Sequence, residues 1–352
     1  MLNLFGTTIE NLFIHRVGNA SRGEGKFLAK EETILDDEVQ PLIKEYFLKP
    51  FRQKEASFLR FHHEVDLEYN YLYNLSRKFL GRPEDVFNQF SELIATHLYS
   101  QSSHPHIKAG EVYICYLKDL VIDNERVDGI GIFKSEIKQD FLQFVKEDRK
   151  LAPKLEQGVN LGKLDKGAII FNTAASEGYK ILSIDNNRYD TKYWLDNFLG
   201  VVEFEDETYF TKKYLKFTQA FAKDVVEPAE DKKESILFAN RAINYFGKND
   251  EFQENNFLDE VIRNPDLKPE FQNYKQTNGP KYGVEDLSTF GINNTAVKDS
   301  QKKFKSLIEL DTNITIKMDF INPESADRFI EKGWDEDKQM YYYLCYFNSE
   351  KK

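Results

Sequence analysis

The sequence predicts an α+β fold, with a largely antiparallel sheet and flanking helices in an N-terminal domain and a smaller α+β C-terminal domain. Short strand-like runs follow one another in the first half of the chain, with helical stretches before and after them, and this grouping favours α+β over a doubly wound sheet. The 352 residues suggest two domains, because a domain takes roughly 150 residues. Hydrophobic residues make up 41% of the chain, and 29 Phe and 19 Tyr supply bulky side chains for the cores.

The N-terminal elements are predicted from periodicity and from helix-start signals. Residues 8–16 alternate between polar and apolar and indicate a strand. Asp36 and Asp37 are suited to cap a helix that Pro50 ends or kinks. The run Gly81-Arg82-Pro83-Glu84-Asp85 is a strong helix start, and apolar residues then recur at helical spacing as far as Leu98.

A meander of antiparallel strands is expected to follow. The expected strands lie at residues 111–117, 127–134, 167–172 and 180–184. Asp123-Asn124-Glu125 is a turn signal between the first two of them, and Gly129 and Gly131 in the second permit close backbone approach.

Aromatic residues at helical spacing predict a long helix over residues 207–226. Glu227-Pro228 breaks this pattern, so the domain boundary is placed there, giving domains 1–226 and 227–352. In the second domain Asp231 begins a helix, residues 256–263 form another, and the polar residues 264–300 are expected to hold a long loop. The runs 307–320 and 340–347 are strand-like and are joined through Gly333-Trp334-Asp335, as a closing β-hairpin.

The net charge of −11, from 59 acidic and 48 basic residues, argues against a protein coated in positive charge. Cys115 and Cys345 both lie in apolar aromatic runs and are expected to be buried and unpaired. No apolar run reaches the ~18–20 residues of a membrane span, and the first residues lack signal-peptide features, so a cytoplasmic location is expected.

Catalytic and cofactor motifs are weak. The glycines of Gly23-Glu24-Gly25 and Gly129-Ile130-Gly131 do not continue into a dinucleotide or P-loop pattern. His62-His63 and His104-Pro105-His106 are the histidine-rich segments, but adjacent histidines chelate poorly and no complete metal-ligand pattern surrounds them. No Gly-x-Ser-x-Gly elbow occurs, so the chain is expected to be no enzyme and to hold no cofactor or metal.

Clustered basic residues are the more informative candidates, because lysines and arginines neutralise nucleic-acid phosphates. Each cluster is also compatible with a solvated helix face, and an acidic run at residues 203–207 precedes the second one. The candidate nucleic-acid-binding residues are Lys146, Arg149, Lys150 and, beside them, Lys154; Lys212, Lys213, Lys216 and Lys223; and Lys298, Lys302, Lys303 and Lys305.

Two stretches carry a family resemblance. The first runs from Ile94-Ala95-Thr96-His97-Leu98-Tyr99-Ser100 through His104-Pro105-His106 to Asp128-Gly129-Ile130-Gly131-Ile132-Phe133-Lys134, and the second comprises Asp190-Thr191-Lys192-Tyr193-Trp194 with the closing Gly333-Trp334-Asp335 segment. These stretches resemble bacterial nucleoid-associated proteins of the YejK/NdpA type, most closely versions from Bacteroidetes-like bacteria, over nearly the whole chain. The resemblance implies a cytoplasmic protein found with the nucleoid, which binds DNA or DNA-bound machinery and has no established enzyme activity.

Three functions therefore remain open. The first is non-enzymatic DNA binding through the local basic clusters. The second is a protein-interaction module that a DNA-bound partner, such as a topology or repair enzyme, recruits to the nucleoid; the net negative charge fits this role better. The third is a metal-dependent hydrolase that uses the histidine segments. The aromatic content is compatible with a homo-oligomer and equally with larger cores.

Overall fold

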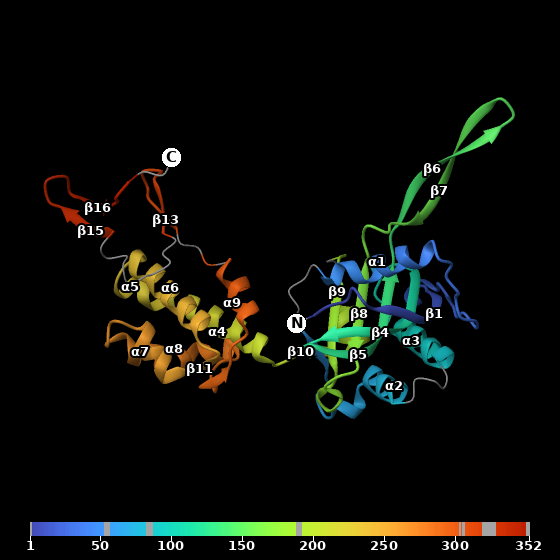
Figure 1. Cartoon of the computed structure of the whole chain (residues 1–352), viewed down its shortest axis with the longest axis horizontal. Helices are drawn as coiled ribbons and strands as arrows, with labels where there is room; N and C mark the ends of the chain where they lie inside the picture. Colours follow the sequence, from blue (N-terminus) through green and yellow to red (C-terminus); the bar gives the residue numbers. More distant parts are fainter. Residues whose placement is uncertain are drawn as a thin grey trace. The chain divides into compact units, whose positions relative to one another are not determined.

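The computed structural model describes residues 2–52, 57–81, 87–187, 192–302, 304, 307–318 and 329–349. The chain divides into two compact units, Met1–Phe204 and Glu205–Lys352. The chain combines helices with a principal sheet that is antiparallel (Figure 1), so the α+β class is confirmed. The predicted boundary between residues 226 and 227 falls inside a continuous helical stretch and stays a prediction.

Unit 1 is built on a sheet that, among the described residues, has eight strands in the order β10-β3-β9-β8-β5-β4-β1-β2. All of its recorded strand pairs are antiparallel, which confirms the expected meander at its centre. The strands are β1 (Thr8–Val17), β2 (Lys26–Phe27), β3 (Leu59–Phe61), β4 (Gly110–Ile122), β5 (Glu125–Ser135), β8 (Lys166–Phe171), β9 (Lys180–Asp185) and β10 (Val201–Glu203).

Helices cover both faces of this sheet. Ile114 and Tyr116 of β4 belong to the core cluster that contains residues of α2 (Tyr71–Leu80) and α3 (Phe87–Gln101). Cys115 belongs instead to the cluster that contains the buried face of α1 (Val39–Arg52). Since both faces are buried, β4 needs apolar residues at nearly every position, which explains its continuous hydrophobic run.

Local signals set several of the element boundaries. Asp123 and Asn124 adopt positive φ angles of 52° and 68° in the two-residue turn between β4 and β5, a conformation that Asp and Asn tolerate better than most residues. The Asp36 Oδ1 atom accepts a hydrogen bond from the Val39 amide at 2.7 Å at the start of α1. The predicted helix start at residues 82–86 lies outside the described residues, although the helix that it introduces is present as α3.

A long hairpin, which we call the arm, interrupts the meander between β5 and β8. It consists of β6 (Lys138–Glu147) and β7 (Lys150–Val159), which pair only with each other and extend away from the sheet (Figure 1). Every residue of its two strands is exposed or half-buried. The sequence prediction did not include these two strands.

Unit 2 packs its helices around an aromatic core that includes Phe217, Phe221, Phe246 and Phe271. Its helical segments are α4 (Glu207–Phe221), η5 (Ala222–Val226), α5 (Glu227–Ala229), α6 (Lys232–Lys248), α7 (Glu254–Val261), α8 (Leu267–Tyr282) and α9 (Asn294–Gln301). Short antiparallel pairs complete it, namely β11 (Glu251–Gln253) with β12 (Thr289–Gly291), β13 (Leu307–Glu309) with β14 (Thr315–Lys317), and β15 (Ile330–Asp335) with β16 (Met340–Cys345).

Three expectations for this unit were wrong. The supposed loop 264–300 contains the helices α8 and α9, most of whose polar residues are exposed or half-buried, with Lys275 and Asp299 buried. The described part of the run 307–320 folds on itself as β13–β14 rather than pairing with the run 340–347, whose strand β16 pairs with β15. Cys345 is exposed, since β16 belongs to a two-stranded hairpin with little cover, whereas Cys115 is buried as expected. Within the described residues, no helix is long and apolar enough to cross a membrane.

Candidate nucleic-acid interface

The first basic cluster lies at the tip of the arm, where Lys146 is the last residue but one of β6, Arg149 occupies the turn and Lys150 begins β7. Acidic residues interleave with it. Lys150 Nζ lies 3.4 Å from a carboxylate oxygen of Glu147, and Lys154 forms an ion pair with Glu156. The tip is therefore a mixed-charge surface rather than a positive one.

The second cluster follows one side of α4 and η5, which form a continuous helix. Lys216 and Lys223 are seven residues apart, so they lie on the same helical face about 10 Å from one another. Both side chains are exposed, and neither has an ion-pair or hydrogen-bond partner among the described residues. Lys212 and Lys213 are half-buried, and the Lys213 ammonium lies 4.8 Å from the centre of the Tyr209 ring.

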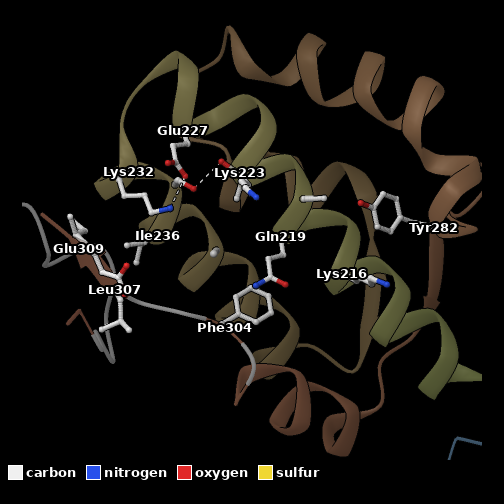
Figure 2. Close-up of a pocket in the computed structure, with 15 residues that line it drawn as sticks. Lys216, Gln219, Lys223, Glu227, Lys232, Ile236, Tyr282, Phe304, Leu307 and Glu309 are labelled. Carbon is white, nitrogen blue, oxygen red and sulfur yellow. Dashed lines mark hydrogen bonds and ion pairs between the residues drawn. The ribbon is translucent and has the colours of Figure 1, made fainter. Parts of the chain in front are cut away.

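Lys216 and Lys223 border a hollow of about 820 Å³ in unit 2 (Figure 2). Lys232 adds a third ammonium group, which is bonded to Glu227 at 2.9 Å. The aromatic rings of Tyr282 and Phe304 line the hollow beside Lys216. The remaining described lining residues are Gln219, Ala220, Ala222, Ser235, Ile236, Ala239, Leu307, Ile308 and Glu309.

The third cluster lies next to the second. Its helix α9 packs against α4, and Phe304, just beyond α9, lines the same hollow as Lys216. Lys298 and Lys302 are on or directly after α9, and Lys302 Nζ bonds to Asp299 at 3.0 Å. Lys303 and Lys305 lie outside the described residues. The fold thus brings two of the three predicted clusters to neighbouring elements, while the first belongs to the other unit.

The histidine segments do not form a metal centre. His62 and His63 are exposed, and the His63 ring packs on Tyr69 with ring centres 5.4 Å apart. The rings of His104 and His106 lie 5.2 Å apart in a turn. In the part of the chain that the structure describes, no three His, Cys, Asp or Glu side chains are grouped so that they could hold a metal ion.

A buried charge network at the base of the arm was missed in the sequence. The ammonium group of Lys134 lies 2.8 Å from Glu136 Oε1, and that of Lys166 lies 2.7 Å from Asp185 Oδ2, with all four side chains almost fully buried. The Tyr193 hydroxyl donates to Glu136 Oε1 at 3.1 Å. The sequence signal that could have revealed this network is the presence of Lys134 and Lys166 in otherwise apolar strands. A buried ammonium group requires a charged partner.

The pKa directions in this network follow from its charges. Burial lowers the pKa of Lys134. Burial alone would raise the pKa of Glu136, but the positive charges of Lys134 and Lys166 outweigh it and hold that pKa below its usual value. Every charge is compensated, so the network is a structural clamp rather than a reactive centre.

Comparison with known proteins identifies the family of the chain. A family model described as "Nucleoid-associated protein YejK" matches residues 13–341, nearly the whole chain. The chain belongs to this family. The resemblance stated from sequence is thereby confirmed, and this family member has a nucleoid-associated role. No curated protein matches the chain.

Proposed function

We propose that this nucleoid-associated protein binds DNA directly, without catalysing a reaction on it, through the lysine-lined hollow of unit 2. The observation that carries the proposal is the pair Lys216 and Lys223, which are exposed, on one helical face and without carboxylate partners among the described residues. Free ammonium groups in such a row can replace the counterions of a phosphate backbone.

The surroundings of these lysines support a nucleic-acid contact. Tyr282 and Phe304 give the hollow aromatic walls beside Lys216, and aromatic rings next to cations suit sugar and base contacts. Lys298 on the adjacent α9 adds a further positive charge. The arm tip, with Lys146, Arg149 and Lys150, is a weaker candidate because Glu147 and Asp148 lie among its basic residues.

The whole-chain charge of −11 makes the expected binding local and salt-sensitive. We expect the purified full chain to bind a duplex at 50 mM salt and to lose affinity steeply by 200 mM, measured by fluorescence anisotropy. Removing two phosphate contacts with Lys216→Ala/Lys223→Ala should reduce the slope of log K against log salt by about 2, because each contact contributes about 0.9.

The matched control, Lys248→Ala/Lys268→Ala, removes two other lysines of the same unit and keeps the change in net charge the same. Lys248 is exposed, and Lys268 is half-buried and bonded to Asp259 at 2.6 Å. These substitutions should leave the slope unchanged. A wild-type protein that shifts neither duplex nor single-stranded DNA at 50 mM salt would contradict direct binding. DNA incubated with the protein and a divalent metal ion should stay intact, and its cleavage would contradict the non-enzymatic role.

A second candidate function is recruitment to the nucleoid by a DNA-bound protein such as a topology or repair enzyme. The net negative charge favours it, and so does the β15–β16 hairpin, whose Trp334, Tyr341 and Tyr342 side chains are exposed. A pull-down from nuclease-treated lysate separates the two, because a partner that is retained without DNA supports recruitment, whereas loss of all partners supports direct binding.

A further inference from the structure

The arm leaves unit 1 from a fixed base. Asp165 Oδ2 accepts hydrogen bonds from the Glu136 and Ile137 amides, at 2.6 and 3.0 Å, directly before β6 begins. The Glu136 side chain is itself held by Lys134 in the buried network. Lys138, the first residue of β6, bonds to Glu111 of β4 at 2.9 Å. The base is therefore rigid, although the arm beyond it makes no strand pairing with the sheet.

One face of the arm is apolar. The register pairs Leu142 with Leu155, and because side chains alternate along a strand, Phe144 and Leu151 point to the same side. These four side chains are 58%, 64%, 62% and 66% exposed, respectively. The opposite face carries Gln143, Glu147, Lys150, Lys154 and Glu156 among fewer apolar residues.

An exposed apolar face on a two-stranded hairpin is expected to be covered by another protein surface. A single two-stranded hairpin is at best marginally stable in water, and a third strand or a covering layer normally completes it. Contiguous exposed apolar side chains mark interaction sites on soluble proteins. Among the described residues, no other element of the chain pairs with the arm.

The charges on the apolar face identify the partner. Asp140 lies three residues before Gln143, towards the base, and Lys146 lies three residues after it, towards the tip, both on the apolar side. The two charges are about 20 Å apart along β6. If two identical arms pack face to face in opposite directions about a two-fold axis at Gln143, each Asp140 meets the Lys146 of the other copy, and Leu142 meets Phe144.

We propose that the β6–β7 arm pairs face to face with the arm of a second copy of this chain, forming a two-fold dimer whose ends are closed by Asp140–Lys146 ion pairs. A nucleic acid fits this face poorly, because Asp140 opposes phosphate and Lys138 is already bonded to Glu111. The self-complementary pattern is what an isologous interface requires. The proposal is independent of DNA binding through unit 2, and it assigns Lys146 to the dimer.

The first test is the mass of the full chain by analytical ultracentrifugation between 5 and 200 µM. We expect a concentration-dependent dimer, and Leu142→Ser/Leu155→Ser should weaken the dimerisation constant at least tenfold. The matched control, Phe141→Ser/Val145→Ser, removes two exposed apolar side chains from the opposite face and should preserve the dimer. Melting followed by circular dichroism checks that each variant is folded. We expect all of them to fold, because the four substituted side chains are exposed.

The second test uses charge reversal, which reports on the two-fold geometry itself. Asp140→Lys alone and Lys146→Asp alone should each weaken the dimer, because each places like charges opposite one another. The double variant Asp140→Lys/Lys146→Asp should restore wild-type affinity. A wild-type protein that stays monomeric at 200 µM overturns the proposal, as does a double variant no tighter than its parents. A loss of DNA binding in Leu142→Ser/Leu155→Ser, with the wild type monomeric, would assign the arm to nucleic acid.

Discussion

Single buried charges govern much of the stability of unit 1. Lys134 and Glu136 are 0% and 4% exposed, so removing one charge leaves the other unpaired in a medium of low polarity. Glu136→Gln should therefore lower the free energy of unfolding by about 3–5 kcal/mol, measured by urea denaturation at neutral pH. Asp119→Asn, which breaks the exposed pair with Arg126, should change it by less than about 1 kcal/mol. Equal effects of the two variants would refute the structural role assigned to the network.

His15 makes the stability depend on pH. Its side chain is buried in β1, where Nδ1 accepts a hydrogen bond from the Ala29 amide at 3.1 Å, and burial lowers its pKa from 6.5 to about 4. Between these values the unfolded chain binds a proton that the folded chain does not. The contribution of the neutral His15 side chain to the free energy of unfolding is therefore fully present above pH 6.5, and it is lost as the pH falls towards 4.

His15→Gln retains an acceptor but cannot titrate. We expect the melting temperature of the wild type to fall more steeply between pH 6.5 and 4.5 than that of this variant, measured by differential scanning calorimetry. His62→Gln, at an exposed position, should reproduce the wild-type slope. Parallel curves for the wild type and His15→Gln would show that another group controls acid stability.

At the residue scale, the sequence predicts what depends on near neighbours in the chain. Asp231 was expected to begin a helix, and it does, by accepting a hydrogen bond from the Glu234 amide at 2.8 Å. Ion pairing was not predictable in the same way. The sequence analysis grouped Lys302 with Lys298 as candidate nucleic-acid-binding residues, yet in the structure Lys302 is bonded to Asp299. Which lysines remain available to phosphates is therefore a property of the fold.

Among the elements, the β5 strand depends on its glycines. A Cβ atom at Gly129 would lie 2.6 Å from the backbone oxygen of Ile170 and 2.7 Å from Leu120 Cδ1, so the backbone of β8 would have to move. Gly129→Ala should destabilise the protein by roughly 1–3 kcal/mol in thermal or urea unfolding. Gly25→Ala is the matched control, because a Cβ atom there meets no described atom within 4 Å. A Gly129→Ala variant that is as stable as the wild type would contradict this close packing.

The elements that sequence reasoning found and missed differ in where their stability comes from. β4 and β5 were predicted because the apolar runs in their own sequences are typical of buried strands. α8 was missed because its Asn, Gly and Pro residues have low helix propensity. Tertiary contacts stabilise it instead, as Lys275 of α8 bonds to Glu254 at 2.9 Å and Phe271 lies in the core. The arm was missed because two-stranded hairpins without a buried face give a weak periodic signal.

For the whole molecule, the hydrophobic cores show how the chain is divided. The two clusters on either face of the large sheet contain only residues up to Phe204, and the aromatic cluster of unit 2 begins with residues of α4. The length of the chain predicted two domains, and the described residues divide into two compact units. The position of the division depends on whether α4 packs in the core of unit 1 or of unit 2. The aromatic residues of α4 alone do not show which core it joins.

This division predicts how fragments behave. Residues 1–204 contain complete cores on both faces of the sheet, so this fragment should be soluble and unfold cooperatively in a urea titration. Residues 1–226 end at the boundary expected from sequence and would carry α4 without its partners. Tyr214, Phe217 and Phe221, which are fully buried in the full chain, would then be exposed, and we expect this fragment to aggregate in size-exclusion chromatography. A soluble, monomeric 1–226 fragment beside an insoluble 1–204 fragment would instead assign α4 to the N-terminal domain and support the boundary at residue 226.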